Sequence, residues 1–185
     1  PTEFDFMTLK YTDKQKLQIM IKELNLIGGS EEQNDINDDI KHFTLDTLLK
    51  IPDYWWVVPA SSSGLYHPSF SCELNGLVKH TKATIQIALT LFEVNVFDFT
   101  QRDRGIILAS LILHDTFKSG LEYGQTKFDH PKMITDFIEE NSKILEMIPK
   151  EDFDKLKSAI NCHMGKWNTK KNSKIELPVP KSKMD

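Results

Sequence analysis

A histidine–aspartate pair is the part of this sequence best suited to chemistry. His114 and Asp115 directly follow an almost unbroken apolar segment, residues 106–113, and Lys118 comes three residues later. Such a segment predicts a helix that is buried on nearly every side. Ionisable groups at the end of a buried helix are costly unless they are paired or bind a metal. The pair is therefore a candidate functional site.

Three further histidines, His80, His130 and His163, have polar neighbours within predicted helices or at their ends. Any one of them alone could be an ordinary core or surface residue. His80 and the 114–115 pair, however, lie on the two most apolar predicted helices, which must pack together in a small domain. Imidazole and carboxylate groups together suit a divalent transition metal such as manganese, iron, cobalt or zinc.

The spacing of apolar residues predicts helices nearly throughout the chain and no sheet. We expect helices from near Asp13 to Gly28, over 43–49, over 72–94, from a cap at Thr100 or Asp103 to 113, over 130–141 with Asp129 as cap, and over 151–165. This pattern indicates a single all-α domain. Residues 1–50 form its N-terminal helical segment with an acidic loop, and residues 51–185 form the helical core that carries the histidines.

The composition is that of a soluble globular domain, since 39% of the 185 residues are hydrophobic and 27% are charged. No apolar run has the length of a membrane span and no secretory signal is evident, so we expect a cytoplasmic protein. Cys72 and Cys162 lie far apart, which suggests neither a disulfide framework nor a zinc knuckle. The net charge of −4 argues against wholesale electrostatic binding to nucleic acid.

The segment 52–68 is a long irregular connection, and such loops inside a domain are often functional. It contains three consecutive serines, Ser61, Ser62 and Ser63. Either these serines bind phosphate through hydroxyl and backbone N–H groups, or they satisfy their own backbone in a turn.

The tryptophans and the lysine-rich end are also open to two interpretations. Trp55, Trp56 and Trp167 either stack on a base or belong to the core or an interface, and exposed aromatic residues near Trp55 would favour a homo-oligomer. Residues 166–185 contain six lysines and two acidic residues. This end is either a solvated, mobile surface or a basic rim, beginning at Lys166, that attracts a phosphorylated ligand.

Two motifs carry a resemblance to a known family, namely Gly76-Leu77-Val78-Lys79-His80-Thr81 and Leu111-Ile112-Leu113-His114-Asp115-Thr116-Phe117-Lys118. They resemble the HD superfamily of metal-dependent phosphohydrolases. His130 and the segment 162–167 resemble the additional histidines of multi-metal members. The order of motifs is similar to that in HD-type 3′–5′ exoribonucleases and in small phage HD proteins. The resemblance covers roughly residues 59–180 and implies an HD-type helical bundle; the dipeptide alone is weak evidence, whereas the ordered set is specific.

The resemblance implies a site with two divalent metal ions. His80, His114 and Asp115 would hold one ion, and Asp115 would bridge to a second ion held by His130 and His163. The ions would be manganese, iron, cobalt, nickel or zinc, with magnesium as a further option. A pair of such ions lowers the pKa of a bridging water and holds a phosphate oxygen.

Two positions in this resemblance carry alternatives. Lys118 would neutralise charge on the phosphoryl group, or it would be a solvated cation that compensates the dipole of a helix end. HD proteins also carry a final metal-ligating aspartate on a helix several residues past the equivalent of Pro180. Either Asp185 supplies this ligand, or the ligand lies beyond Asp185, or the site lacks it.

We therefore expect a metal-dependent phosphohydrolase that cleaves phosphate ester or anhydride bonds of a nucleotide or deoxynucleotide, with no membrane partner. Lys118, Lys166, Trp167 and the three serines are its candidate substrate-binding residues. The motif order and the lysine-rich end favour an alternative, a 3′–5′ exonuclease that acts on single-stranded RNA or DNA. A non-catalytic helical module that binds a nucleotide or a metal is an alternative from another class.

Overall fold

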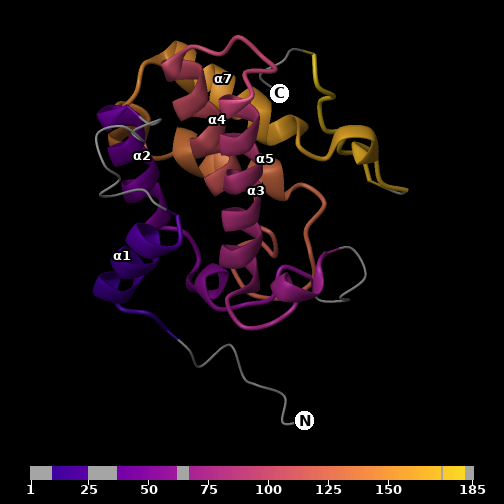
Figure 1. Ribbon diagram of the computed structural model, residues 1–185. Helices are drawn as coiled ribbons and strands as arrows, with labels where there is room; N and C mark the ends of the chain where they lie inside the picture. Colours follow the sequence, from indigo (N-terminus) through magenta and orange to yellow (C-terminus); the bar gives the residue numbers. More distant parts are fainter. Residues whose placement is uncertain (1–9, 25–36, 62–66, 172, 182–185) are drawn as a thin grey trace.

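Helix α4 (Gln101–Leu113) lies in the middle of the molecule, and α2 (Asp38–Leu48), α3 (Gly76–Glu93) and α7 (Lys150–Cys162) pack against it (Figure 1). The computed structural model describes residues 10–24, 37–61, 67–171 and 173–181. The almost fully buried residues of α4 include Ile106, Ala109, Ile112 and Leu113. The predicted buried helix is confirmed, and the residues directly after it are held inside the domain.

The remaining helices are α1 (Asp13–Lys22), α5 (His130–Glu139), α6 (Ser142–Leu145) and the short 3-10 helices η3 (Asp53–Trp56), η4 (Ser69–Ser71) and η5 (Gly165–Trp167). The described residues form no strand, only one isolated antiparallel bridge between Thr169 and Glu176. The prediction of a single all-α domain is confirmed. Among the helices of the described residues, none combines the length and the apolar character needed to cross a membrane.

The first two helices begin where acidic residues or caps favour them. Helix α1 starts at Asp13, as predicted, after a capping box formed by Thr12, but it ends at Lys22, before the predicted end at Gly28. Helix α2 starts at Asp38, five residues before the predicted start. Asp38 and Asp39 lie in its first turn, where negative charge stabilises the positive end of the helix dipole. The apolar pattern alone gave no sign of this first turn.

Helix α4 is fixed at its start by a cap and an ion cluster. Thr100 and Asp103, the two predicted alternatives, act together in a capping box, because the side chain of each accepts a hydrogen bond from the backbone N–H of the other. The Arg102 guanidinium donates to Asp39 of α2 at 2.8 and 2.6 Å and to Asp152 of α7 at 2.9 and 2.5 Å. One arginine therefore joins the starts of three helices at the end of α4 remote from His114.

Trp55 and Trp56 are core residues. Both side chains are fully buried, and their rings meet edge to face with centroids 5.0 Å apart. Lys16 of α1 covers η3, since its ammonium donates to Asp53 at 2.6 Å and lies 5.9 Å from the centroid of the Trp56 ring. Because both side chains are fully buried, the interpretation of Trp55 and Trp56 as exposed rings for base stacking or self-association is wrong. Burying their large apolar area stabilises the core.

The start of α3 depends on a close backbone contact at Gly76. The preceding residue, Asn75, adopts the left-handed conformation (φ 60°), which ends the turns before it, so α3 begins four residues later than predicted. A Cβ on Gly76 would lie 2.0 Å from the Ser71 carbonyl oxygen and 2.7 Å from the Ala60 nitrogen. Only glycine lets the backbone of Ala60 and Ser71 lie against the helix one turn before His80.

We expect Gly76→Ala to destabilise the protein by about 3 kcal/mol, because the added methyl group would displace backbone atoms that cannot move independently. Urea denaturation followed by circular dichroism measures the change. Gly124→Ala is the matched control, since a Cβ there has no heavy atom within 4 Å. Equal stabilities of the two variants would contradict this account of Gly76.

Candidate metal centre

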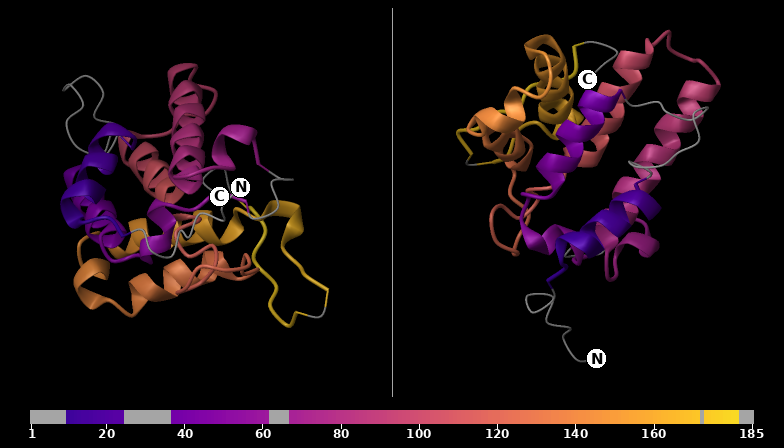
Figure 2. Two further views of the ribbon diagram at one scale, coloured as in Figure 1. Left: turned by 90° about the horizontal axis from the view of Figure 1, so that it is seen from below. Right: turned by 90° about the vertical axis from the view of Figure 1, so that its left-hand side faces the viewer.

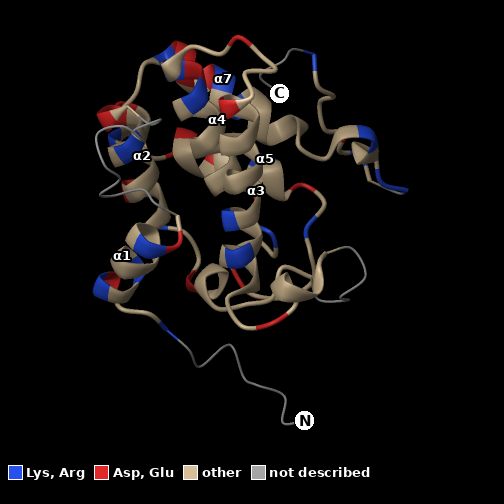
Figure 3. Cartoon of the chain, in the orientation of Figure 1, with Lys and Arg blue, Asp and Glu red and all other residues tan. Residues whose placement is uncertain are grey.

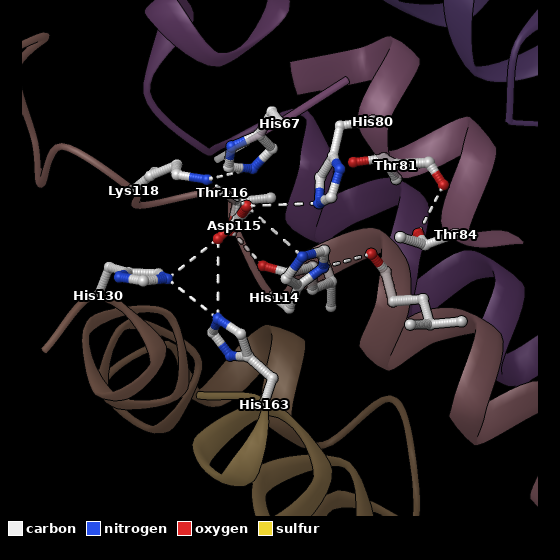
Figure 4. A network of polar contacts seen from close by, with 12 residues as sticks. His67, His80, Thr81, Thr84, His114, Asp115, Thr116, Lys118, His130 and His163 are labelled. Carbon is white, nitrogen blue, oxygen red and sulfur yellow. Dashed lines mark hydrogen bonds and ion pairs between the residues drawn. The ribbon is translucent and has the colours of Figure 1, made fainter. Parts of the chain in front are cut away.

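The Asp115 carboxylate is the centre of a cluster of histidines inside the domain (Figure 4). Its side chain is only 5% exposed. Its Oδ2 atom lies 3.8 Å from Nε2 of His80 and 3.5 Å from Nε2 of His114, and it accepts a hydrogen bond from the Lys118 ammonium at 2.8 Å. We refer to these groups as the Oδ2 side of the centre.

The other carboxylate oxygen of Asp115 faces a different pair of histidines. Its Oδ1 atom lies 3.0 Å from Nε2 of His130 and 3.8 Å from Nε2 of His163. These two histidines form the Oδ1 side of the centre. One carboxylate thus separates two groups of nitrogen atoms, one at each of its oxygens, and Asp115 belongs to two groups of residues that could each hold a metal ion.

Helix ends position these side chains. His114 and His163 cap the carboxyl ends of α4 and α7, His130 is the first residue of α5, and His80 lies in the second turn of α3. Because α4 packs on α3 and α7, and α5 packs on α7, these ends meet. The structure brings all five predicted ligands together: His80, His114, Asp115, His130 and His163. Two helix carboxyl ends also favour positive charge at the centre.

Three of the histidines are oriented by their own backbone. The Nδ1 atoms of His114, His130 and His163 donate to the carbonyls of Leu111 at 2.7 Å, Lys127 at 2.6 Å and Ile160 at 2.7 Å. A carbonyl only accepts, so in each neutral ring the proton lies on Nδ1 and the Nε2 lone pair faces Asp115. Histidines that bind metals are usually held in this way.

The atoms on the Oδ1 side need a positive charge between them. The Nε2 atoms of His130 and His163 lie 3.1 Å apart, and His130 Nε2 lies 3.0 Å from Asp115 Oδ1. In the neutral rings these three atoms are all acceptors, which repel one another unless a proton or a cation lies among them. Two ligands about 2.1 Å from a tetrahedral metal are about 3.4 Å apart. The spacing therefore fits a divalent metal ion.

The protonation states also suit metal binding. Burial lowers the pKa of His80 and of His114 to about 4, and it lowers that of His163 below its usual value. Burial alone would raise the pKa of Asp115, but the nearby His114 and Lys118 hold it well below its usual value. Near neutral pH, His80, His114 and His163 are thus neutral imidazoles and Asp115 is an ionised carboxylate, which are the forms that bind metals.

His67 also lies at the centre, although the sequence pattern did not single it out as a ligand. Its ring centroid is 4.9 Å from that of His80, and one potential ligand atom from each of His67, His80 and Asp115 lies within 4.8 Å of the other two. His67 belongs to the irregular connection 52–68, where no helical spacing relates it to the other histidines. The only signal in the sequence was the unusual length of that connection.

Lys118 points into the centre. The residue is 9% exposed, so the interpretation of Lys118 as a solvated helix-end cation is wrong. Tyr54 of η3 holds the adjacent loop, because its hydroxyl accepts from the Ser119 N–H and donates to the Gly120 carbonyl, both at 2.9 Å. Burial raises the pKa of Tyr54 to about 12, so the hydroxyl remains a donor. The phosphate role of Lys118 stays a prediction.

A cavity of about 1110 Å³ lies beside these groups and extends away from them. Its lining includes Asp115, Lys118, Ser61 and the histidines. Along α3 and α4 the lining continues about two to three turns from His80 and His114. The apolar residues of this part, which we call the apolar arm, are Leu91, Phe92, Phe97, Phe99, Ile107 and Leu111. Trp167 also lines the cavity and is 67% exposed, and the Lys166 ammonium lies 4.7 Å from the centroid of its ring. Of the predicted substrate-binding residues, Ser61, Lys118 and Trp167 therefore reach the cavity.

Other predicted site residues lie elsewhere. Ser62, Ser63 and Asp185 are outside the described residues, and so is Lys183. The described part of the chain beyond η5 extends away from the helices (Figures 1 and 2). Basic residues of this part are coloured blue in Figure 3, and Lys170, Lys171 and Lys174 are exposed. These lysines belong to a projecting surface, and their attraction of a phosphorylated ligand stays a prediction.

Comparisons with protein-family models, with curated proteins and with solved structures found no match to this chain. The conclusions about the centre therefore depend on its own geometry. That geometry is a buried cluster of histidines and one aspartate that could hold a metal ion.

We expect the metal-free protein to lose stability as the pH falls from about 6.5 to about 4. The pKa of His80 and of His114 is lowered from 6.5 to about 4 on folding, so the unfolded chain binds protons in this range that the folded chain does not. Urea denaturation in the presence of a chelator, at several pH values, measures the slope. In a His80→Asn, His114→Asn double variant the slope should be smaller but not zero, because the pKa of His67 is also lowered to about 4 by burial. An unchanged slope would contradict the assignment.

Proposed function

We propose that this protein is a metal-dependent phosphohydrolase of the HD superfamily, which cleaves a phosphate ester or anhydride bond of a nucleotide or deoxynucleotide. The observation that carries the proposal is the division of the histidines between the two oxygens of Asp115, with His80 and His114 at Oδ2 and His130 and His163 at Oδ1. This division matches the ligand sets that the motif resemblance implies. It supports a two-metal centre bridged by one carboxylate.

The residues fit divalent manganese, iron, cobalt, nickel or zinc, all of which accept imidazole and carboxylate ligands. When bound, a pair of such ions supplies a water of lowered pKa and a positive clamp for a phosphate oxygen. Asp115 would hold its negative charge between the two positions, because its pKa is well below the usual value. The imidazoles would keep their Nε2 lone pairs directed at these positions through their bonds to backbone carbonyls.

Lys118 and Ser61 would bind the phosphate. The Lys118 ammonium lines the cavity and carries a positive charge that favours phosphate oxygens, which Lys binds as a point charge. Ser61 lines the same cavity and offers a hydroxyl group. Burial of the centre strengthens these electrostatic contacts relative to those in water.

The apolar arm would hold the nucleoside. Phe97 and Phe99 offer ring faces, with centroids 5.5 Å apart, on which a flat base can stack. A single cavity with polar groups and an apolar arm fits a small phosphorylated molecule. The exonuclease alternative has a separate observation in its favour, since Trp167 and the exposed lysines at 170, 171 and 174 offer ring and charge contacts for a strand.

The proposal is tested by incubating the manganese- or zinc-loaded protein with a panel of ribonucleotides and deoxynucleotides and with single-stranded RNA and DNA. We expect release of phosphate or nucleoside from the panel, and a loss of at least about a thousandfold in kcat for Asp115→Asn, because this change removes the bridging charge. Cleavage of oligomers with all nucleotides left intact would favour the exonuclease. Metal or nucleotide binding without any cleavage would favour the non-catalytic module.

A second prediction concerns the apolar arm. Phe97→Ala should raise KM for a nucleotide about tenfold, because it removes one stacking face, while kcat changes little. Ile21→Ala of α1 is the control, since Ile21 is exposed to a similar extent (46%, compared with 44% for Phe97) and lies away from the cavity. Steady-state kinetics of both variants decide the point, and an equal KM for Phe97→Ala and the unchanged protein would exclude the arm as the nucleoside site.

A further inference from the structure

The Lys118 ammonium occupies a position that suits a metal ion. It donates to Asp115 Oδ2 at 2.8 Å and lies 3.3 Å from His67 Nε2. A carboxylate oxygen and an imidazole nitrogen thus both direct lone pairs at one positive charge. A divalent metal ion would use the same two lone pairs. The ammonium and a metal ion at this position therefore exclude each other.

His67 is placed to be a ligand of that metal ion. Its Nδ1 atom is buried and finds no hydrogen-bond partner among the described residues. Its Nε2 atom is the one that faces Lys118. One nitrogen of the ring is therefore directed at the cation position, together with His80 and Asp115, whose potential ligand atoms lie within 4.8 Å of that of His67 and of each other. The motif resemblance gives no role to His67.

The two sides of Asp115 differ in whether a lysine or arginine already pairs with the carboxylate oxygen. On the Oδ2 side, a lysine pairs with the carboxylate. On the Oδ1 side, the ion pairs found among the described residues come only from His130 and His163, and no lysine or arginine takes part. A cation that binds at Oδ1 meets two oriented imidazoles and no competing charge. A cation that binds at Oδ2 must first displace an ammonium.

We propose that His67 is a protein ligand of the metal position at Asp115 Oδ2, and that Lys118 is an internal cation that an incoming divalent metal displaces from this position. The Oδ1 position then fills first and the Oδ2 position second, with lower affinity. Displacement also frees the Lys118 ammonium for the cavity. The lysine thus becomes available to a phosphate group only when the second metal ion is in place.

This inference concerns the same centre as the proposed function, so its test measures metal binding and not activity. Metal-stripped protein is titrated with Mn²⁺, and free Mn²⁺ is counted by electron paramagnetic resonance, which resolves a tight and a weak class of site. Lys118→Met removes the ammonium and keeps the length of the side chain. We expect it to tighten the weak class by about tenfold or more, since a competing charge is lost, and to leave the tight class unchanged.

Two further variants assign the classes to residues. His67→Phe should weaken or abolish the weak class and leave the tight one, whereas His130→Phe should abolish the tight class. Lys132→Met is the matched control for the lysine, because Lys132 of α5 pairs with Asp136 and takes no part in the centre. It should change neither class. Circular dichroism and thermal melting of each variant establish that the fold is intact.

The inference is overturned if Lys118→Met leaves the weak class unchanged or weakens it, or if His67→Phe binds two Mn²⁺ ions with unchanged affinities. These outcomes are separable from the fate of the proposed function. If metal binding shows the expected pattern but no phosphorylated substrate is cleaved, the function fails and the inference stands. If substrates are cleaved while the Lys118→Met variant binds metal like the unchanged protein, only the inference fails.

Discussion

The convergence of four imidazoles and an ammonium on one buried carboxylate is the interaction on which the rest of this structure depends. An ionised aspartate that is 5% exposed is tolerated only when its charge is compensated nearby. The Lys118 ammonium in the loop after α4 compensates this charge, and histidines of α3, α5 and α7 could hold a metal ion that does the same, so these segments must meet at the end of α4. The apolar residues of α4 make that meeting possible, because the same helices bury their apolar faces against it. The same helix packing thus forms the apolar core and brings the groups of the centre together.

The sequence was sufficient where the signals are local. The apolar segment 106–113 predicted a buried helix with polar residues held inside the domain directly after it, and the ordered motifs predicted which five side chains would meet. The signals failed where burial is decided by contacts distant in the sequence. Trp55 and Trp56 fitted both exposed and buried positions, and the contacts of η3 with α3 and with Lys16 of α1 decide between them. His67 lies outside any helix, so no periodicity related it to the other ligands.

The two sides of Asp115 are also held differently. On the Oδ1 side, His130 and His163 are both fixed by hydrogen bonds to backbone carbonyls at helix ends, so their nitrogen atoms are oriented before any ion arrives. On the Oδ2 side, His114 is held in the same way. His67 belongs to an irregular connection, and Lys118 to the loop beyond α4. The Oδ1 side is therefore preorganised throughout, whereas the Oδ2 side also contains two groups from irregular segments, and we call it the adaptable side.

The hydrogen bonds of Tyr54 affect how fast Lys118, on the adaptable side, can leave Asp115 when a cation is exchanged. Its hydroxyl holds the backbone of both Ser119 and Gly120, and its ring is anchored in the core. Lifting this loop would break two buried hydrogen bonds, so Lys118 leaves Asp115 by rotation about its own side-chain bonds. Such rotations belong to the picosecond to nanosecond range, whereas loop opening takes far longer. The barrier to cation exchange at this position is thus the separation of one ion pair, and the backbone is the same before and after each exchange.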